Sequence, residues 1–432
     1  LTMDIMVWRR QHVCQKWWVP TIFIGRDTRI SGTLIESAMT AGFLSYGANV
    51  KMLGVMPTPA VAYLTKKFKA DASVVISASH NTFEFNGVKY FSNKGMKIPD
   101  ELEEEIEEVM DSGKINELTA VNDKIGTSEI ATELLDEYVY FFRKNFEEDL
   151  EKLNRDDFVV AVDTANGATS VVADKVFTVL GIKHHILNDS PNGININDGC
   201  GSTHLEMLKQ YVIDKKCSLG IAYDGDGDRC LAVDENGNEI DGDKIIAIIS
   251  QYLKSKGKLN KDTIVATVMS NLGLNKYAKQ NELNFVQTKV GDRYVLEEML
   301  KNGYNLGGEQ SGHVICLDYN PTGDGILTSL MIIRAILEQG KKASEVASIM
   351  KAYPQVLINA KVSSDKKYDF DKDEEIKSAI EKLNKEFDGN GRVLIRASGT
   401  EPLVRVMIEG EDQDYIKQKA QTIANLIEQI RA

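Results

Sequence analysis

Three aspartates alternate with glycines in the run Asp224-Gly-Asp-Gly-Asp-Arg229. Glycines let the backbone fold tightly, so three carboxylates at this spacing can converge on one hard cation. Mg²⁺ suits such a site because it takes few protein ligands and leaves positions for water or phosphate oxygen. We therefore predict that Asp224, Asp226 and Asp228 bind one Mg²⁺ ion.

A calcium loop and a simple acidic turn are the competing interpretations of this run. An EF-hand loop needs glutamate at its twelfth position, which is Glu235 when counted from Asp224, so the spacing alone does not exclude it. The β-like run Leu219–Ala222 before the aspartates and the adjacent Arg229 argue against it, because EF-hand loops lie between helices.

A second candidate is the segment Ser77-Ala-Ser-His-Asn81, which follows another β-like run. A phosphorylated serine is a ready phosphoryl donor with about −1.5 to −2 charge at neutral pH, which a nearby Mg²⁺ would offset. Taken alone, the segment fits better with a surface Ser/Asn turn in which His80 forms hydrogen bonds. A Ser-His-Asp hydrolase is not indicated, because no nucleophile elbow is present.

Two further loops combine groups that suit a sugar phosphate. The run Gly307–His313 offers the carboxylate of Glu309, the hydroxyl of Ser311 and the imidazole of His313, a mixture that suits sugar hydroxyls. The second loop, with the downstream Arg405, offers arginines for bidentate phosphate contacts and a turn that exposes N–H groups and hydroxyls. Its candidate phosphate-binding residues are Arg396, Ser398, Gly399, Thr400 and Arg405.

Each of these loops has a purely structural alternative. The first fits a tight turn with capping residues, and the second fits a hairpin loop with incidental arginines. The run Gly25-Arg-Asp-Thr-Arg29 is less specific still. Either arginine could contact phosphate, with Arg26 the candidate carried forward, or pair with Asp27.

The polar segments follow short β-like runs, which alternate with helical patterns such as Asp100–Asp111. This alternation predicts open α/β sheets, in which ligands bind beyond the carboxyl ends of the strands. The expected strands are Thr21–Ile24, Val74–Ile76, Phe158–Val162, Leu219–Ala222 and Thr263–Val268.

Turn-rich or polar breaks near 151–157, 234–242 and 352–355 divide the chain. After the last break the pattern changes to strands at 392–395 and 403–408 with helices at 374–387 and 414–431. We predict an α/β protein with three similar mixed α/β sheet domains and a C-terminal α+β domain. The expected domains are residues 1–145, 146–236, 237–352 and 353–432.

The composition of the chain limits the classes of partner that it is expected to bind and indicates the cellular compartment in which it is expected. The net charge of −13 disfavours nucleic acid and acidic lipid, and no apolar run approaches the roughly 18 to 20 residues of a membrane span. Five scattered cysteines predict free thiols in a reducing cytoplasm. At the N-terminus, basic residues such as Arg9 and Arg10 interrupt the apolar residues, so no signal peptide is predicted.

In their order and spacing these motifs resemble the α-D-phosphohexomutase superfamily, from about Thr21 to the C-terminus. The runs GRDTRISG, ISASHN, DGDGDR, VGDRYV (290–295), GGEQSGH and RASGTEPLVRVMIEG are most similar to the bacterial phosphoglucosamine mutase subfamily. Gln310 is the most useful discriminator, because phosphomannomutase and phosphoglucomutase relatives tend to carry methionine there.

The resemblance implies four domains around a central cleft and the interconversion of glucosamine 6-phosphate and glucosamine 1-phosphate, an isomerase reaction that feeds UDP-N-acetylglucosamine and cell-wall synthesis. A phosphate on Ser79 would complete the Mg²⁺ shell and pass to the sugar, giving a 1,6-bisphosphate intermediate. His80, Lys89 and Arg229 are the implied acid/base and electrostatic residues. The partner is a small hexosamine phosphate, and a homodimer is one candidate assembly.

Two departures from the family pattern bear on activity. Residues 1–20 lack the FGTDGIRG-like opening of the family and contain three tryptophans, so we expect a truncated or altered beginning. Thr82 stands where the family usually has proline. The alternatives are a phosphomannomutase or phosphoglucomutase, a truncated and weakly active sugar-phosphate binder, and a Mg²⁺-dependent phosphatase, which would need no second phosphate site.

Overall fold

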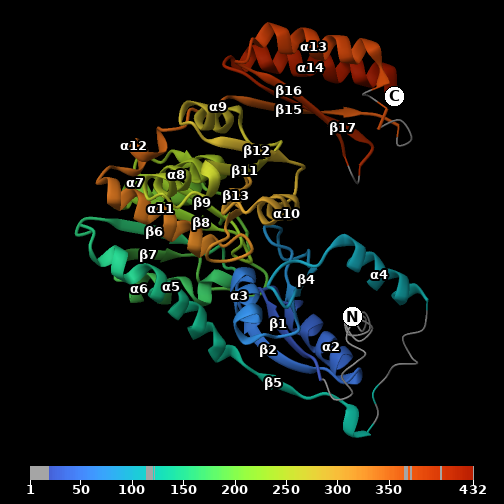
Figure 1. Ribbon diagram of the computed structural model, residues 1–432, viewed down its shortest axis with the longest axis vertical. Coiled ribbons are helices and arrows are strands. Elements are labelled where there is room, and N and C mark those ends of the chain that lie inside the picture. The colour runs from blue at the N-terminus through green and yellow to red at the C-terminus, as the bar shows by residue number, and fades with distance from the viewer. Residues whose placement is uncertain are drawn as a thin grey trace. The chain divides into compact units, whose positions relative to one another are not determined.

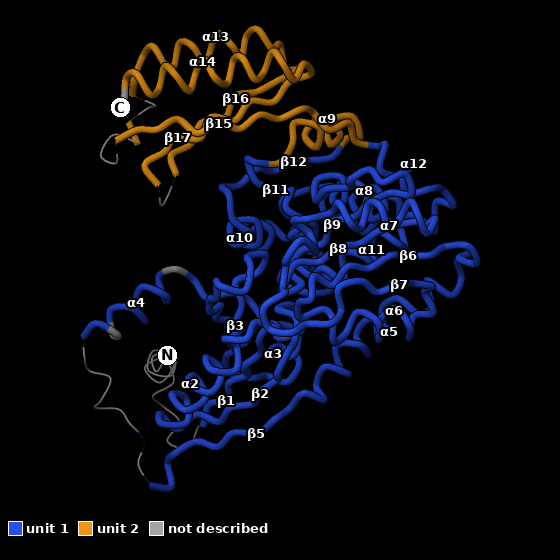
Figure 2. Tube along the Cα trace, turned by 180° about the vertical axis from the view of Figure 1, so that it is seen from behind, with its two compact units in different colours: residues 1–269, 283–349 blue, residues 270–282, 350–432 orange. Residues whose placement is uncertain are grey.

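The computed structural model describes residues 19–112, 120, 122–363, 368–369, 372–398 and 401–431. The atypical residues 1–18 therefore lie outside the described part. The chain divides into two compact units, one of residues 1–269 and 283–349 and the other of residues 270–282 and 350–432 (Figure 2). Within the described residues, no helix is both long and apolar enough to cross a membrane.

The first sheet has the order β4-β3-β1-β2-β5, with β4 antiparallel to β3 and the other pairs parallel. Its central strand β1 contributes apolar residues that pack against a helix side chain, Phe43, in a closed core. The elements are β1 (Thr21–Arg26), α2 (Gly32–Ser45), β2 (Asn49–Val55), α3 (Thr58–Phe68), β3 (Ala72–Ile76), β4 (Val88–Ser92), α4 (Asp100–Asp111), β5 (Ser128–Ile130) and α5 (Leu135–Glu151).

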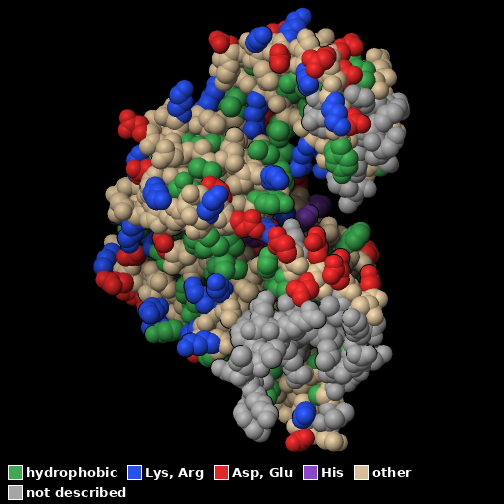
Figure 3. All heavy atoms as spheres, turned by 45° about the vertical axis from the view of Figure 1, so that its right-hand side comes forward, with side chains coloured by type: hydrophobic (Ala, Val, Ile, Leu, Met, Phe, Trp, Pro, Cys, Tyr) green, Lys and Arg blue, Asp and Glu red, His purple; other side chains and the backbone are tan. Residues whose placement is uncertain are grey.

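Helix α4 packs through Leu102 and Ile106 against Ile98 and Tyr90. Its remaining face is rich in glutamate, and acidic side chains gather there on the surface seen in Figure 3.

The second sheet has the order β10-β9-β8-β6-β7 and the third the order β12-β11-β13-β14 (Figure 1). Every residue of the central strands β8, β9 and β11 is buried, as expected for sheets covered by helices. The elements are β6 (Val159–Asp163), α6 (Ala173–Val179), β7 (Lys183–Leu187), α7 (Glu206–Lys215), β8 (Leu219–Tyr223), β9 (Cys230–Asp234), β10 (Glu239–Ile240), α8 (Gly242–Ser255), β11 (Thr263–Thr267), β12 (Asn284–Thr288), α10 (Asp292–Asn302), β13 (Leu306–Gly308), β14 (Val314–Cys316), α11 (Gly325–Gln339) and α12 (Ala343–Ala347). Single-turn 3₁₀ segments lie at Asn122–Lys124, Thr132–Leu134, Ala168–Val171 and Asn260–Asp262.

The second unit is an antiparallel sheet, β15-β17-β16, packed against two helices. In its central strand Val404, Val406 and Ile408 are fully buried, so the alternating residue Arg405 lies on the opposite face. The elements are α9 (Leu272–Gln280), β15 (Gln355–Lys361), α13 (Glu374–Phe387), β16 (Arg392–Ala397), β17 (Leu403–Glu409) and α14 (Gln413–Arg431).

The fold class expected from the sequence is confirmed: mixed α/β sheets are followed by an α+β unit. The predicted boundary between residues 145 and 146 falls inside α5, whereas the division at residue 350 lies close to the predicted start of the last domain. The four-domain boundaries stay predictions.

Candidate active site

The loop after β3 brings Ser79 to the aspartate loop that follows β8. Ser79 Oγ donates a hydrogen bond of 2.6 Å to Asp224 Oδ2, although the two residues are 145 positions apart. The backbone of Ser79 is left-handed, with φ 52°, a strained conformation that clusters at functional sites. Gly225 permits the approach, because a Cβ there would lie 2.6 Å from the Ser79 carbonyl oxygen.

The three aspartates form the acidic group expected from the sequence. One carboxylate oxygen from each of Asp224, Asp226 and Asp228 lies within 4.8 Å of the others, and all three side chains are buried. Two helix N-termini hold the loop: Thr58 N–H at the start of α3 donates to the Asp226 carbonyl at 2.9 Å, and Gly325 N–H at the start of α11 donates to Gly227 at 2.9 Å. The positive ends of both helix dipoles therefore face the acidic loop.

Buried charge in this loop is balanced by cations. Lys89 Nζ lies 2.6 Å from Asp226 Oδ2 and 3.0 Å from Asp228 Oδ2. Burial lowers the pKa of Lys89, but Asp226 and Asp228 outweigh burial and raise it above the ordinary value. Lys89 is therefore charged in the folded protein.

The carboxylates respond unequally to this environment. Burial, together with the charges of Asp228 and Asp226, raises the pKa of Asp224 well above its ordinary value. Burial also acts to raise the pKa of Asp228, but Lys89 and His313 outweigh it and hold that pKa well below the ordinary value. The environment thus disfavours the anionic form of Asp224 and stabilises that of Asp228.

A divalent cation fits the donor set of this loop. Asp226 Oδ1 and Asp228 Oδ1 are buried and have no hydrogen-bond partner in the described part of the chain. Buried carboxylate oxygens without a partner are costly, and hard oxygen ligands are what Mg²⁺ prefers. The residues present therefore fit the predicted Mg²⁺.

Two other predicted groups lie in this region. The backbone N–H of Arg229 donates to Asp224 Oδ1 at 3.1 Å, and its buried side-chain Nε has no hydrogen-bond partner among the residues described. Burial and the charge of Arg229 lower the pKa of His80, whose buried Nδ1 likewise lacks a partner in the described residues. A neutral imidazole and a charged guanidinium are thus available near Ser79.

The run Gly307–His313 turns between β13 and β14. Glu309 Oε1 accepts from Gly291 N–H at 3.1 Å, and Ser311 Oγ is buried without a hydrogen-bond partner in the described residues. The ring of His313 contacts Asp228, with His313 Nδ1 3.6 Å from Asp228 Oδ1. The sugar-binding role of all three stays a prediction.

Gln310, which is expected from the sequence to discriminate between the subfamilies, has a structural partner. Its Nε2 donates to Asp241 Oδ2 at 3.2 Å, and Asp241 Oδ1 caps α8 through Lys244 N–H at 3.0 Å. A methionine at this position would leave that carboxylate oxygen without this donor. Gln310 therefore ties its loop to the start of α8.

The second unit carries the predicted phosphate-binding residues. Arg396 and Arg405 are directly opposite each other in the β16–β17 pair, and like charges so placed are destabilising. Burial and the charge of Arg405 lower the pKa of Arg396. Ser398 Oγ accepts from Glu401 N–H at 3.2 Å, whereas Gly399 and Thr400 lie outside the described residues.

Of the two arginines in GRDTR, Arg26 is half-buried and pairs with Glu36 at 3.1 Å, so its predicted phosphate contact stays a prediction. Arg29 is fully buried and pairs with Asp27 at 2.8 Å, which was one of the two expected alternatives. Its guanidinium also donates to the carbonyls of Ser79 at 3.0 Å and Asn81 at 2.8 Å, and to that of Thr82.

Sequence reasoning missed the groups that hold the two loops. Asn197 Nδ2 donates to the same carbonyls as Arg29, at 2.9 Å to Ser79 and 2.8 Å to Asn81. The Thr58 hydroxyl donates to Asp226 Oδ2. Thr58 could have been identified from the sequence, because it follows β2 as the other polar segments follow their strands. Nothing in the sequence marks Asn197.

We expect Arg29→Met to lower turnover by about ten- to a hundredfold, because Arg29 holds three carbonyls of the Ser79 loop. It should also lower the free energy of unfolding by about 3–5 kcal/mol, since Asp27 is left as an unpaired buried charge. Urea unfolding and kcat measure the two effects. Arg143→Met, which removes an exposed pair with Glu147, is the control, and normal turnover in Arg29→Met would contradict the assignment.

Comparisons with known proteins agree with this architecture. Four domain models of the phosphoglucomutase/phosphomannomutase family match the chain: alpha/beta/alpha domain I at residues 11–117, domain II at 136–237, domain III at 241–353 and the C-terminal domain at 357–426. The chain therefore belongs to the phosphoglucomutase/phosphomannomutase family.

The similar curated relatives are phosphoglucosamine mutases. That of Ruminiclostridium cellulolyticum is 52% identical over 409 residues, 95% of this chain and 90% of the relative. One from Clostridium botulinum is 54% identical over 412 residues, again 95% and 90%.

More distant solved structures share the fold. A Burkholderia thailandensis phosphoglucomutase/phosphomannomutase family protein has a TM-score of 0.76 at 20% identity and covers 94% of this chain and 89% of its own. The Aspergillus fumigatus N-acetylphosphoglucosamine mutase, solved with GlcNAc-6P and magnesium, has a TM-score of 0.62 at 19% identity and covers 87% and 93%.

Proposed function

We propose that this chain is a phosphoglucosamine mutase that interconverts glucosamine 6-phosphate and glucosamine 1-phosphate through a phosphorylated Ser79. The observation that carries the proposal is the 2.6 Å hydrogen bond from Ser79 Oγ to Asp224 in a buried group of three aspartates. A serine in this position can give and take a phosphoryl group at a place where the negative charge of that group is neutralised. Identity of 52–54% to curated phosphoglucosamine mutases supports the choice of substrate.

The reaction consists of two phosphoryl transfers. In the first, the sugar O1 attacks the phosphorus on Ser79, the P–Oγ bond breaks, the O1 proton passes to a base, and Oγ takes up a proton. The resulting 1,6-bisphosphate reorients, and Ser79 Oγ gives its proton to a base as it attacks the 6-phosphate. The P–O6 bond breaks, O6 takes up a proton, and glucosamine 1-phosphate leaves. Such transfers depend mainly on positioning and charge stabilisation.

Residues of this chain fill the required roles. Asp224, Asp226 and Asp228, with the phosphate on Ser79, would hold one Mg²⁺, which when bound neutralises charge on the transferring phosphoryl group. Lys89 and Arg229 add fixed positive charge, and His80 is the candidate for proton transfer. Glu309 and Ser311 are proposed to hold sugar hydroxyls.

We also place the enzyme in the cytoplasm, because its four described cysteines are free thiols.

Substrate choice is tested by comparing kcat/KM for glucosamine 6-phosphate and glucose 6-phosphate. We expect glucosamine 6-phosphate to be preferred by at least about tenfold, since a site that accepts several hydrogen bonds from a 2-amino group receives only one from the hydroxyl of glucose 6-phosphate. A higher kcat/KM with glucose 6-phosphate would favour the phosphoglucomutase alternative instead.

The opposed Arg396 and Arg405 are proposed to hold whichever phosphate is not reacting, because an anion between them would relieve their repulsion. A charge-assisted arginine–phosphate contact contributes roughly 1.5 to 3 kcal/mol, about ten- to a hundredfold in binding. We therefore expect Arg405→Ala to raise the KM for glucosamine 6-phosphate by that factor and to release more bisphosphate per turnover.

Lys419→Ala is the matched control, since it removes a cation from α14 of the same unit, where it pairs with Glu386. An unchanged KM with no additional bisphosphate release in Arg405→Ala would mean that the arginine pair has a structural role only.

A further inference from the structure

The imidazole of His313 lies between two carboxylates. Its Nδ1 is 3.6 Å from Asp228 Oδ1, and its Nε2 is 3.5 Å from Asp292 Oδ2. The His313 side chain is only 4% exposed. Asp228 belongs to the proposed metal group, whereas Asp292 begins α10 within the VGDRYV run, for which the proposed function has no role. His313 therefore connects the metal group to an aspartate outside it.

Nε2 of His313 has a partner in either protonation state of the ring. Gly323 N–H donates to Nε2 at 3.1 Å when the ring is neutral. When both ring nitrogens carry protons, Nε2–H faces the carboxylate of Asp292 instead. In both protonation states Nδ1 carries a proton, and its N–H faces Asp228. The ring can therefore keep the same orientation whether it is neutral or charged.

Two further residues fix this arrangement. A Cβ at Gly323 would lie 2.5–2.6 Å from three atoms of the His313 ring, so a side chain there would displace the imidazole. Lys97, from the segment after β4, pairs with Asp292. Burial raises the pKa of Asp292, but His313 and Lys97 outweigh burial and lower it to about 2, so this carboxylate is ionised.

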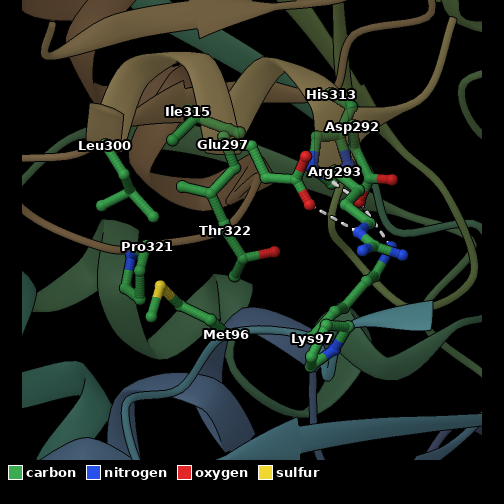
Figure 4. Close-up of a pocket in the computed structure, with 12 residues that line it drawn as sticks. Met96, Lys97, Asp292, Arg293, Glu297, Leu300, His313, Ile315, Pro321 and Thr322 are labelled. Carbon is green, nitrogen blue, oxygen red and sulfur yellow. Dashed lines mark hydrogen bonds and ion pairs between the residues drawn. The ribbon is translucent and has the colours of Figure 1, made fainter. Parts of the chain in front are cut away.

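Figure 4 shows these side chains at one end of a cavity of about 180 Å³. Asp292, His313 and Lys97 come from three separate segments and converge there, while Leu300 and Ile315 line the opposite, apolar part. The carboxylate that faces Nε2 of His313 is therefore itself held by a cation from a third segment.

We propose that Asp292 and Gly323 are positioning residues that hold His313 against Asp228 and thereby fix the orientation of that carboxylate toward the cation. This inference rests on the proposed metal site. Residues that orient a metal-binding carboxylate without touching the metal contribute to the free energy of metal binding. Their loss typically lowers metal affinity by about ten- to a hundredfold.

The test uses Mn²⁺ alone as the probe, titrated into the dephosphorylated full chain and followed by the electron paramagnetic resonance of free Mn²⁺. We expect Asp292→Asn and Gly323→Ala each to weaken Mn²⁺ binding by about ten- to a hundredfold, with Asp292→Glu recovering part of the loss. Asp174→Asn is the matched control, because Asp174 pairs with a different histidine, His184, at 3.0 Å, and it should bind Mn²⁺ normally.

Wild-type Mn²⁺ affinity in folded Asp292→Asn and Gly323→Ala would overturn the proposal, since the contacts would then only join α10 to its neighbours. If Gly323→Ala does not fold, Asp292→Asn and Lys97→Met carry the test, and normal affinity in both would overturn it. A wild-type chain that binds no Mn²⁺, or an Asp226→Asn variant that binds it normally, would overturn the metal site itself and both proposals with it.

Discussion

Replacement of Ser79 by alanine is expected to abolish mutase turnover, a loss on the order of 10⁶-fold of the kind seen when a covalent nucleophile is removed. The hydroxyl that contacts Asp224 is the atom that must give and take the phosphoryl group. The fold should persist, because Ser79 lies in a loop and only part of its side chain is buried. The measurement is steady-state conversion of glucosamine 6-phosphate, with circular dichroism to confirm folding.

Ser92→Ala is a matched control, since Ser92 is also half-buried, lies in β4 and donates to the Met96 carbonyl at 3.2 Å. It should retain near-normal turnover. Near-normal turnover in Ser79→Ala itself would exclude the phosphoserine mechanism.

The second large effect is expected at the metal group. Asp226→Asn keeps the shape of the side chain but removes one charge from the three aspartates, so Mg²⁺ affinity and turnover should fall by about 100-fold or more. The amide would also face Lys89, which now donates to Asp226 Oδ2 at 2.6 Å. Calorimetric titration with Mg²⁺ and kcat at saturating Mg²⁺ separate the loss of affinity from the loss of chemistry.

Asp234→Asn is the control for this variant. Asp234 is also buried and is the last residue of β9, but its carboxylate accepts from Asn236 N–H and Asn238 N–H, each at 2.9 Å. It should lose stability and keep its metal affinity. Full activity of wild-type protein treated with EDTA, without any divalent ion restored, would contradict the metal assignment.

Much of the fold could be predicted from local patterns in the sequence. The expected helix at 374–387 is α13 with the same limits, and the expected helix Asp100–Asp111 is α4. Both have apolar residues at helical spacing on one face only, which is the clearest periodic signal a sequence contains. The expected strand Thr21–Ile24 extends to Arg26, because pairing with β2 and β3 continues past the apolar residues.

The candidate site was predictable where polar residues follow strands, as with Ser79 and the three aspartates. It was not predictable where one side chain satisfies a distant backbone. Arg29 contacts the Ser79 loop across about 50 positions, and Asn197 does so across more than 110. The contact of the His313 ring with Asp228, at 3.6 Å, was likewise not predictable from the sequence, and the sugar-binding role of His313 stays a prediction. Such contacts depend on how separate sheets pack, which no local pattern encodes.

The most direct test of the central claim is a single-turnover transfer from phosphorylated enzyme. Purified chain carrying labelled phosphate on Ser79, confirmed by peptide mass, is mixed with unlabelled glucosamine 6-phosphate and Mg²⁺. We predict that the label leaves the protein and appears first in the 1,6-bisphosphate and then in glucosamine phosphate. Label that stays on the protein, or that appears directly as inorganic phosphate, would contradict the mutase account.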